Sequence, residues 1–299
     1  MLFRSGVVDP GGFNMSPASY LPLFQVWRDR QLTVRVSYSL FSQKAGKEFD
    51  EYKELTQMTP MGFGDDWLRF NGIGERVTFG MYNNDAPTEK DKDELYAIAK
   101  WAAERGMSLT HHWQNGKVVD AFLDVVERVN RDVPVAPLRW SIAHLNDATD
   151  ANLARMKSLG VGWTVQNAMY FEGEAFAKSR GGDVGRRAPP VVSALKLGVP
   201  AGAGTDAHRV MSYNPFVALQ WLLDGKTVSG TQLRGPEQTP TREQALRLYT
   251  AGSAWFDHSE KRRGTLEPGK LADLAVLSKD YLKVPVGEIG GIESLLTMV

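Results

Sequence analysis

The sequence predicts an α/β fold in which parallel strands are joined by helices. Two observations support this class. Short β-rich runs alternate with helical segments from residue 6 to residue 204, and the 299 residues are 42% hydrophobic and 23% charged, as in an ordinary globular protein. Such alternation implies right-handed crossovers between parallel strands. An open doubly wound sheet and a closed (β/α)8 barrel both remain possible, and a barrel needs eight strands where we count seven.

The seven candidate strands are short runs rich in β-branched or apolar residues that stop at turn residues. They cover residues 6–9, 32–38, 68–74, 107–113, 138–145, 162–165 and 199–204. Most are separated by a segment with helical spacing of apolar residues. These helices are expected at 20–27, 88–105, 118–129, 150–159 and 191–197. Residues 172–190 are rich in glycine and charge and are expected to form a long loop beside a substrate pocket.

The character of the chain changes after residue 204. Helices are expected at 214–223 and 241–254, the second capped by Thr241. A Pro268-Gly269 turn then precedes an apolar strand at 272–277, which falls outside the earlier rhythm. We therefore predict two units, a barrel-like domain over 1–260 and a small β-element over 261–299.

Composition excludes several classes of function. Thirty-five basic residues balance 35 acidic ones, which argues against nucleic acid or an anionic membrane as partner. The absence of cysteine excludes disulfides, thiolate zinc sites, iron–sulfur clusters and cysteine nucleophiles. No run approaches the roughly 18–20 apolar residues of a membrane span. The compartment stays open, with the cytoplasm as the default.

Polar residues end four of the predicted strands. They are Glu75, His112, His144 and Asp206. Since the carboxyl ends of parallel strands meet at one edge, these side chains are expected to converge. Imidazole and carboxylate are ligands of zinc and other first-row divalent ions. A bound ion lowers the pKa of water towards about 7, with a carboxylate as general base, which suits hydrolysis of amides, amidines or esters.

Each of these residues also has a plain structural interpretation. A lone histidine at a strand end is often a packed, hydrogen-bonded core residue, and Asp206 could cap the turn that follows it. Gln166 and Asn167 either line the pocket and bind substrate or cap a loop, and His208 could touch substrate. His111 is expected to orient its loop.

Four stretches together carry a resemblance to a known family. Residues 112–123 and 139–144 each hold a strand-end histidine, and Gly202-Ala203-Gly204-Thr205-Asp206 is similar to a strand-end Gly-Ser-Asp motif. Residues 264–277 fit the pattern G-x-L-x-P-G-x-x-A-D-L-x-V-L. The chain thereby resembles the amidohydrolase superfamily, specifically amidohydrolase family 3.

The resemblance implies a TIM-like (β/α)8 barrel with a small β-sandwich. Counting residues 6–9 as strand 2 leaves an incomplete barrel of strands 2–8 and a remnant of the sandwich at the C-terminus. The family's first strand carries a His-x-His pair, and no two histidines here are separated by one residue. The chain is therefore expected to be a fragment with weak metal affinity and little activity.

The resemblance also assigns roles to the strand-end residues. His112 and His144 become metal ligands, Asp206 a ligand and the general base, and Glu75 the ligand that bridges two ions. The cofactor implied is a divalent metal, zinc, as one or two ions. The expected function is hydrolysis of carbon–nitrogen bonds other than peptide bonds in a small-molecule substrate. The alternatives are a related metal-dependent esterase or deaminase, or an inactive barrel remnant that serves as an interaction protein. Homo-oligomerisation stays open.

Overall fold

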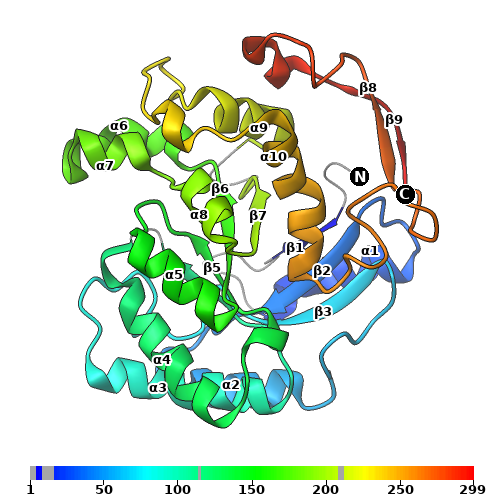
Figure 1. Ribbon diagram of the computed structural model, residues 1–299. Helices are drawn as coiled ribbons and strands as arrows, with labels where there is room; N and C mark the ends of the chain where they lie inside the picture. Colours follow the sequence, from blue (N-terminus) through cyan, green and yellow to red (C-terminus); the bar gives the residue numbers. More distant parts are fainter. Residues whose placement is uncertain (1–4, 9–16, 114–115, 208–211) are drawn as a thin grey trace.

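The computed structural model describes residues 5–8, 17–113, 116–207 and 212–299 (Figure 1). Parallel strands run through the first 204 residues at the places that the sequence predicts. They are β1 (Ser5–Val8), β2 (Arg35–Leu40), β3 (Leu68–Ile73), β4 (Thr110–Trp113), β5 (Ser141–His144), β6 (Gly162–Gln166) and β7 (Ala201–Gly204). The predicted parallel α/β class is confirmed.

The strands lie side by side in chain order. β1, β2 and β3 form one parallel sheet, and β4 to β7 form a second. A parallel bridge between Ile73 and Leu109 links the two sheets, and the Ile73 amide donates to the Ser108 carbonyl at 3.0 Å. Within the described residues no strand ladder joins β7 to β1. All the carboxyl ends therefore face the same side of the molecule.

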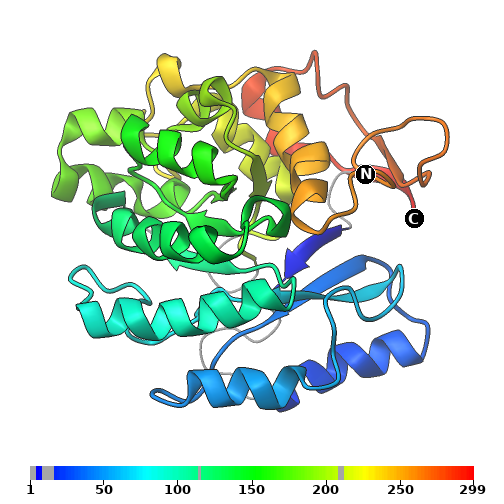
Figure 2. The ribbon, with the colours of Figure 1, turned by 60° about the horizontal axis from the view of Figure 1, so that its bottom comes forward.

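Helices connect these strands and cover their outer faces (Figures 1 and 2). They are α1 (Leu21–Arg28), α2 (Glu48–Thr56), α3 (Glu89–Glu104), α4 (Val119–Asp132), α5 (Asp150–Leu159) and α8 (Val191–Leu197). Thr88 and Thr149 begin α3 and α5 with capping boxes, and Gly160 ends α5 in the left-handed conformation with φ 69°. Local sequence thus defined these ends, whereas α2 was not predicted.

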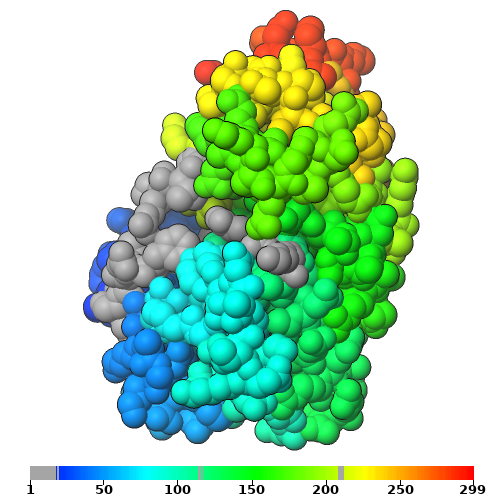
Figure 3. Space-filling model, turned by 90° about the vertical axis from the view of Figure 1, so that its left-hand side faces the viewer, coloured from blue at the N-terminus to red at the C-terminus, as the bar shows by residue number. Residues whose placement is uncertain are grey.

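The expected loop at 172–190 is wrong. Two helices occupy most of it, α6 (Met169–Arg180) and α7 (Gly182–Arg187), and their light-green segment forms part of the outer surface in Figure 3. Gly173 lies inside α6, where an added Cβ would come 2.4 Å from Leu233 Cδ2. This glycine permits close packing instead of a turn, and sequence alone does not distinguish the two uses.

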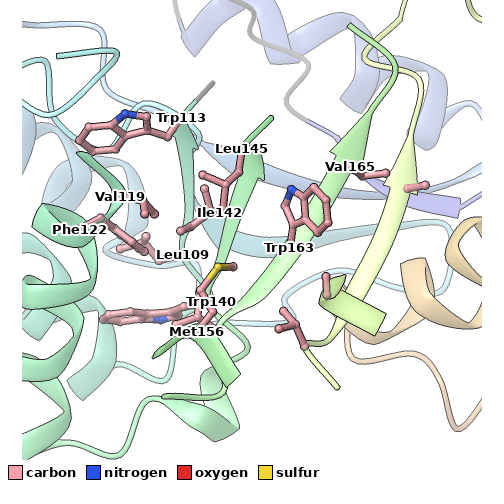
Figure 4. Packing of buried hydrophobic residues seen from close by; sticks show 14 of the residues in the cluster. Leu109, Trp113, Val119, Phe122, Trp140, Ile142, Leu145, Met156, Trp163 and Val165 are labelled. Atoms are coloured by element: carbon pink, nitrogen blue, oxygen red, sulfur yellow. The ribbon is translucent and has the colours of Figure 1, made fainter. Parts of the chain in front are cut away.

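The core lies between the strands and the surrounding helices. Figure 4 shows Trp113, Trp140 and Trp163 among apolar side chains of the strands and of the helices α4 and α5, such as Ile142 and Phe122. Each of the three rings is at most 1% exposed. The Trp140 indole donates to the Met107 carbonyl at 3.0 Å, so even this deep ring keeps its hydrogen bond.

The C-terminal third begins with more helices. They are α9 (Pro215–Asp224), α10 (Arg242–Arg247), the π-helical η5 (Leu248–Gly252) and α11 (Ser253–Phe256). Strand β8 (Leu274–Leu277) confirms the predicted strand at 272–277 and pairs antiparallel with β9 (Ser294–Met298). Short 3-10 turns complete the chain at Pro17–Tyr20, Gly116–Val118, Ala136–Leu138, Pro236–Gln238 and Val286–Gly291. The domain boundary at residues 260/261 stays a prediction. In the described chain, every helix is too short or too polar to cross a membrane.

Candidate metal centre

Three side chains from the ends of β3, β4 and β5 meet at one point. His112 Nδ1 lies 2.5 Å from Glu75 Oε2 and 3.0 Å from His144 Nε2. His144 Nε2 lies 3.5 Å from the same Glu75 oxygen. Both histidines are 2% exposed. The structure therefore brings together three of the four side chains that were predicted to be ligands.

Glycines let the end of β3 approach β4 closely enough to place Glu75. Gly72 and Gly74 have φ values of 103° and 124°, and a Cβ on either would come 2.0 Å from a carbonyl oxygen of the 108–110 segment. The Gly74 amide donates to the Leu40 carbonyl at 2.8 Å, and the His112 amide donates to the Glu75 carbonyl at 3.1 Å. Two backbone bonds thus fix Glu75 between β2 and β4.

The alternation of side chains along β4 separates its two histidines. His112 faces Glu75, whereas His111 points into the core and stacks on Phe122, with ring centroids 4.8 Å apart and planes 5° apart. Burial, together with the neighbouring His112, lowers the pKa of His111 to about 3, so that its imidazole is neutral at physiological pH. His111 is therefore a buried core side chain, and its expected role in orienting the loop stays a prediction.

The position of His144 is set by the neighbouring strand β6. Its backbone takes the left-handed conformation, with φ 73°. The His144 amide donates to Gln166 Oε1 at 3.0 Å, and the His144 carbonyl accepts from the Trp163 indole at 2.8 Å. Gln166 was predicted to bind substrate, and in this structure its amide oxygen holds the backbone of a candidate ligand.

The two imidazoles determine the charge of Glu75. Burial by itself would raise the pKa of Glu75, but the hydrogen bonds and charges of His112 and His144 outweigh burial and hold that pKa well below its usual range. Burial opposes protonation of His144, yet Glu75 and the more distant Asp206 raise its pKa overall. Glu75 is therefore an anion that faces two imidazoles.

This donor set fits a divalent metal ion. The three ligand atoms all lie within 4.8 Å of one another, and two histidines with one glutamate form a known zinc ligand set. Tetrahedral bonds of about 2.1 Å place ligand atoms about 3.4 Å apart, and two of the three separations here are within about 0.4 Å of that value. A small outward shift of Glu75 from His112 would complete the match.

Asp206 is the predicted ligand that the structure leaves outside this group. It follows β7 with φ 55°, and its side chain is exposed at the rim. Desolvation by the surrounding protein raises the pKa of Asp206 to about 6; His144 opposes this shift, and the carboxylates of Glu75 and Glu172 add to it. Asp206 thus interacts with the centre through its charge, without contacting Glu75 or the histidines.

Helical residues hold the carboxyl end of β7 beneath Asp206. The Tyr249 hydroxyl donates to the Gly204 carbonyl at 3.1 Å, and Ser253 Oγ donates to the Ala203 carbonyl at 3.0 Å. Both donors come from the segment around the π-turn η5, and burial raises the pKa of Tyr249, which keeps its phenol protonated. π-turns often occur at functional sites.

Three further residues bear on the surroundings of the candidate metal centre. Asn167 is 1% exposed, and neither polar atom of its amide has a hydrogen-bond partner in the structure as described, so it stays a candidate for substrate binding. Glu172, which the sequence did not single out, lies on α6 and acts on Asp206 and His144 through its charge. The sequence predicts a loop at 172–190, and a loop gives no reason to expect Glu172 at a fixed place beside the site. His208 falls outside the described residues.

A parallel α/β fold with a Glu–His–His group at the carboxyl ends of its strands is an arrangement that suits a metal-dependent enzyme. Comparison with known proteins gives the family. The model of the amidohydrolase family matches residues 3–299. The chain therefore belongs to the amidohydrolase family.

Two curated relatives share part of this sequence. An N-substituted formamide deformylase from Arthrobacter pascens is 29% identical over 210 residues, which cover 70% of this chain and 38% of the relative. A 5-methylthioadenosine/S-adenosylhomocysteine deaminase from Symbiobacterium thermophilum is 26% identical over 228 residues, covering 71% and 47%. The matched region covers less than half the length of either relative.

Solved structures agree on the fold. Uncharacterized metal-dependent hydrolases from Pyrococcus horikoshii and Pyrococcus furiosus have TM-scores of 0.71 and 0.68 at 20% and 22% identity. The matches cover 96% and 95% of this chain and 57% and 56% of theirs. A mutant atrazine chlorohydrolase from Arthrobacter aurescens, solved with zinc and atraton, has a TM-score of 0.60 at 15% identity, covering 99% of this chain and 67% of that one.

Proposed function

We propose that this protein is a metal-dependent hydrolase that cleaves carbon–nitrogen bonds other than peptide bonds in small molecules. The observation that carries the proposal is the convergence of Glu75, His112 and His144 within 4.8 Å at the strand ends. These residues would hold a divalent ion, zinc, in a centre of one or two ions. When bound, such an ion supplies an activated water, with a pKa near about 7, and a positive charge for a developing oxyanion.

Asp206 is proposed as the general base. Its pKa of about 6 makes it a carboxylate at neutral pH, yet basic enough to take a proton from the attacking water. The same group can then give this proton to the leaving nitrogen, so that an amine departs in place of an amide anion. Asp206 also stands as the fourth metal ligand in the proposal, which requires its exposed side chain to turn inward.

Other residues would bind or orient. Gln166 accepts a hydrogen bond from the His144 backbone and would thereby keep the His144 imidazole directed at the ion. Gln166 itself lies at the end of β6, on the side where the substrate would bind. Asn167 offers a buried amide whose donor and acceptor are both unused within the described chain. His208 keeps its proposed contact with substrate from the same rim.

N-substituted formamides are the first substrate class to test. Water would add to the formyl carbon, the carbon–nitrogen bond would break, and formate and an amine would leave. The printed function of the Arthrobacter pascens relative supports this choice. The Symbiobacterium thermophilum relative supports a second candidate, hydrolytic deamination, in which ammonia is released instead.

The same proposal includes the finer architecture. The seven strands would be strands 2–8 of a (β/α)8 barrel, and β8 with β9 would belong to a small β-sandwich. Support comes from the chain-order pairing of β1 to β7, the antiparallel β8–β9 pair and the TM-scores of the metal-dependent hydrolases.

Metal content and turnover test the proposal together. The purified chain would be loaded with zinc, dialysed, analysed for bound metal and assayed for formate and ammonia release. We expect His112→Asn and His144→Asn to lose both metal and turnover. His258→Asn is the matched control, because His258 is exposed and bonds Ser108 Oγ at 3.1 Å, before β4 begins. Equal metal binding in all four proteins would refute the assignment, and an inactive wild type that binds metal would favour a non-catalytic remnant.

A further inference from the structure

Each histidine of β4 packs against one aromatic ring. The centroid of the Tyr82 ring lies 4.8 Å from that of the His112 ring, with the planes 33° apart. The Phe122 ring lies at the same distance from His111 and almost parallel to it, at 5°. Because side chains alternate along a strand, His112 faces the candidate metal centre and His111 faces the core. The two ring contacts are thus similar in kind, but the Tyr82 contact is the one that bears on a proposed ligand.

The Tyr82 contact and the Glu75 contact restrict His112 in different ways. Packing against the Tyr82 ring restricts the plane of the imidazole, and the 2.5 Å contact between His112 Nδ1 and Glu75 Oε2 selects the edge of the ring that points to the centre. A histidine nitrogen that binds a metal ion carries no proton, so the Glu75 hydrogen bond would be given up in the loaded centre. The Tyr82 contact does not depend on that proton and would persist.

Tyr82 belongs to the same segment as Glu75, and this segment is fixed directly after Glu75. Arg76 Nε and Nη2 both donate to the Ser42 carbonyl, at 3.1 and 2.7 Å. The Arg76 carbonyl accepts from the Tyr52 hydroxyl at 2.9 Å. Arg76 is therefore held through both its side chain and its backbone, and it is only 8% exposed.

The fixed guanidinium group lies against three aromatic rings. Arg76 Cζ is 4.4 Å from the ring centre of Phe79, 5.2 Å from that of Phe41 and 5.8 Å from that of Tyr82. These distances are within the range of favourable cation–π contacts. Met81, the residue before Tyr82, is fully buried and anchors the backbone at this point. The Tyr82 ring is therefore held from the side of β2 and β3 and lies against the His112 imidazole on β4.

We propose that Tyr82 is a positioning residue of the candidate metal centre, whose ring, supported by the Arg76 guanidinium, holds the His112 imidazole at the angle that a bound ion requires. The inference rests on the proposed function, because it concerns the same centre. Without a ring at position 82 the imidazole would be free to tilt, and ion binding would have to order it. Residues that orient a metal ligand in this way typically contribute about 10–100-fold to metal affinity.

Zinc affinity tests this role without any substrate. Isothermal titration calorimetry of the full chain would give the zinc Kd of each variant. Tyr82→Leu removes the ring and should raise the Kd at least about tenfold. Tyr82→Phe keeps the ring and should stay within about twofold of the wild type. An unchanged Kd in Tyr82→Leu would overturn the proposal, and so would an equal loss in Tyr82→Phe, because the hydroxyl group would then be responsible.

Phe122→Leu is the matched control, because it removes the ring that packs against the other histidine of β4. Phe122 is 1% exposed and lies in the core (Figure 4), so this variant should lower the melting temperature. Its zinc Kd, measured below that temperature, should equal the wild-type value. A loss of zinc affinity as large as that of Tyr82→Leu would refute the proposal, since loosening of β4 would then explain both results.

Two further measurements keep the test decisive. Tyr82→Met, with a flexible side chain that fills space without fixing a plane, should weaken zinc as Tyr82→Leu does and replaces that variant if it does not fold. Visible absorption of the cobalt-loaded chain reports coordination geometry, and it should change in Tyr82→Met but not in Tyr82→Phe. A wild type that binds no zinc would refute the metal centre and the role of Tyr82 together. A wild type that binds zinc, with unchanged affinity in Tyr82→Leu and Tyr82→Met, would refute the role of Tyr82 alone.

Discussion

The two ends of the strands both bury charge, but they bury different kinds of charge. At the carboxyl end, one carboxylate faces two imidazoles, whose protons can leave. At the amino end, carboxylates face guanidinium groups, which stay protonated. The pairs are Asp273 with Arg35, which begins β2, and Asp257 with Arg263. Buried ion pairs of permanent charge fix segments in place, whereas an imidazole nitrogen can lose its proton to solvent and bind a cation instead. The carboxyl end therefore suits the proposed metal chemistry, whereas the ion pairs of the amino end attach the C-terminal segment to the strands.

The largest expected effect is on turnover, which should depend on residues at the carboxyl end of the strands and not on those at the amino end. Replacing His112 or His144 by Asn should reduce turnover at least about a thousandfold, because each change removes a proposed ligand of the ion. Turnover of the zinc-loaded chain with an N-substituted formamide is the measurement. Arg35→Gln, at the amino end, should retain most of the activity per folded molecule. Loss of equal size in both would break the comparison.

The next largest effect is on the free energy of unfolding, and here substitutions at the amino end should cost the most. Asp257→Asn leaves Arg263 and Arg69 without their shared carboxylate and should cost about 3–5 kcal/mol in the free energy of unfolding, as for a broken buried pair. Urea denaturation measures it. The exposed pair of Lys279 and Glu288 is the control, and Glu288→Gln should cost less than about 1 kcal/mol. Similar costs would mean that the amino-end network is not an anchor.

The pH dependence should come from the carboxyl end. Protonated Asp206 cannot accept a proton, so the rate should fall about tenfold per pH unit below the pKa of this carboxyl group. That pKa is about 6 in the metal-free chain, and a bound cation beside Asp206 would lower it. Asp206→Asn should abolish this limb along with most activity. An acid limb that persists unchanged in Asp206→Asn would exclude Asp206 as the base.

Asp206 should also affect stability, with the opposite sign to an ordinary paired carboxylate. Its folded pKa lies above the unfolded value of about 3.9, so the favourable contribution is complete below pH 4 and lost as the pH rises through 6. Asp206→Asn should therefore stabilise the chain at pH 7, by about 1 kcal/mol after allowance for the exposed side chain. Thermal unfolding at pH 4 and pH 7 measures this, and a larger gain at pH 4 would contradict it.

The smallest effects compare one hydroxyl group at each end. Tyr249→Phe removes the bond to the Gly204 carbonyl, and Ser108→Ala removes the bond to the Leu138 carbonyl at 2.9 Å. Each should cost about 1 kcal/mol of stability. Only Tyr249→Phe should also lower turnover, because it loosens the end of β7 that carries Asp206. Equal turnover in both variants would show that β7 needs no such support.

Sequence reasoning located the strands and three of the residues that meet. Glu75, His112 and His144 could be named because each directly follows or ends a β-rich run, and parallel strands place such positions at one edge. The same reasoning did not distinguish Asp206, which is equally close to a strand end. Asp206 has a left-handed backbone and an exposed side chain, and the bonds from Tyr249 and Ser253 that hold the end of β7 come from a distant segment that no local pattern encodes.

Local sequence therefore determined the elements themselves. Hydrophobic periodicity and the caps at Thr88, Thr149 and Gly160 depend on interactions between residues only a few positions apart. They can therefore be recognised in the sequence without knowledge of the tertiary structure. Tertiary structure alone decided which polar groups would meet: Gln166 with the His144 backbone, Asp273 with Arg35 across 238 positions, and Gly173 with Leu233. These contacts depend on distances between segments far apart in the chain, which only the packed fold fixes.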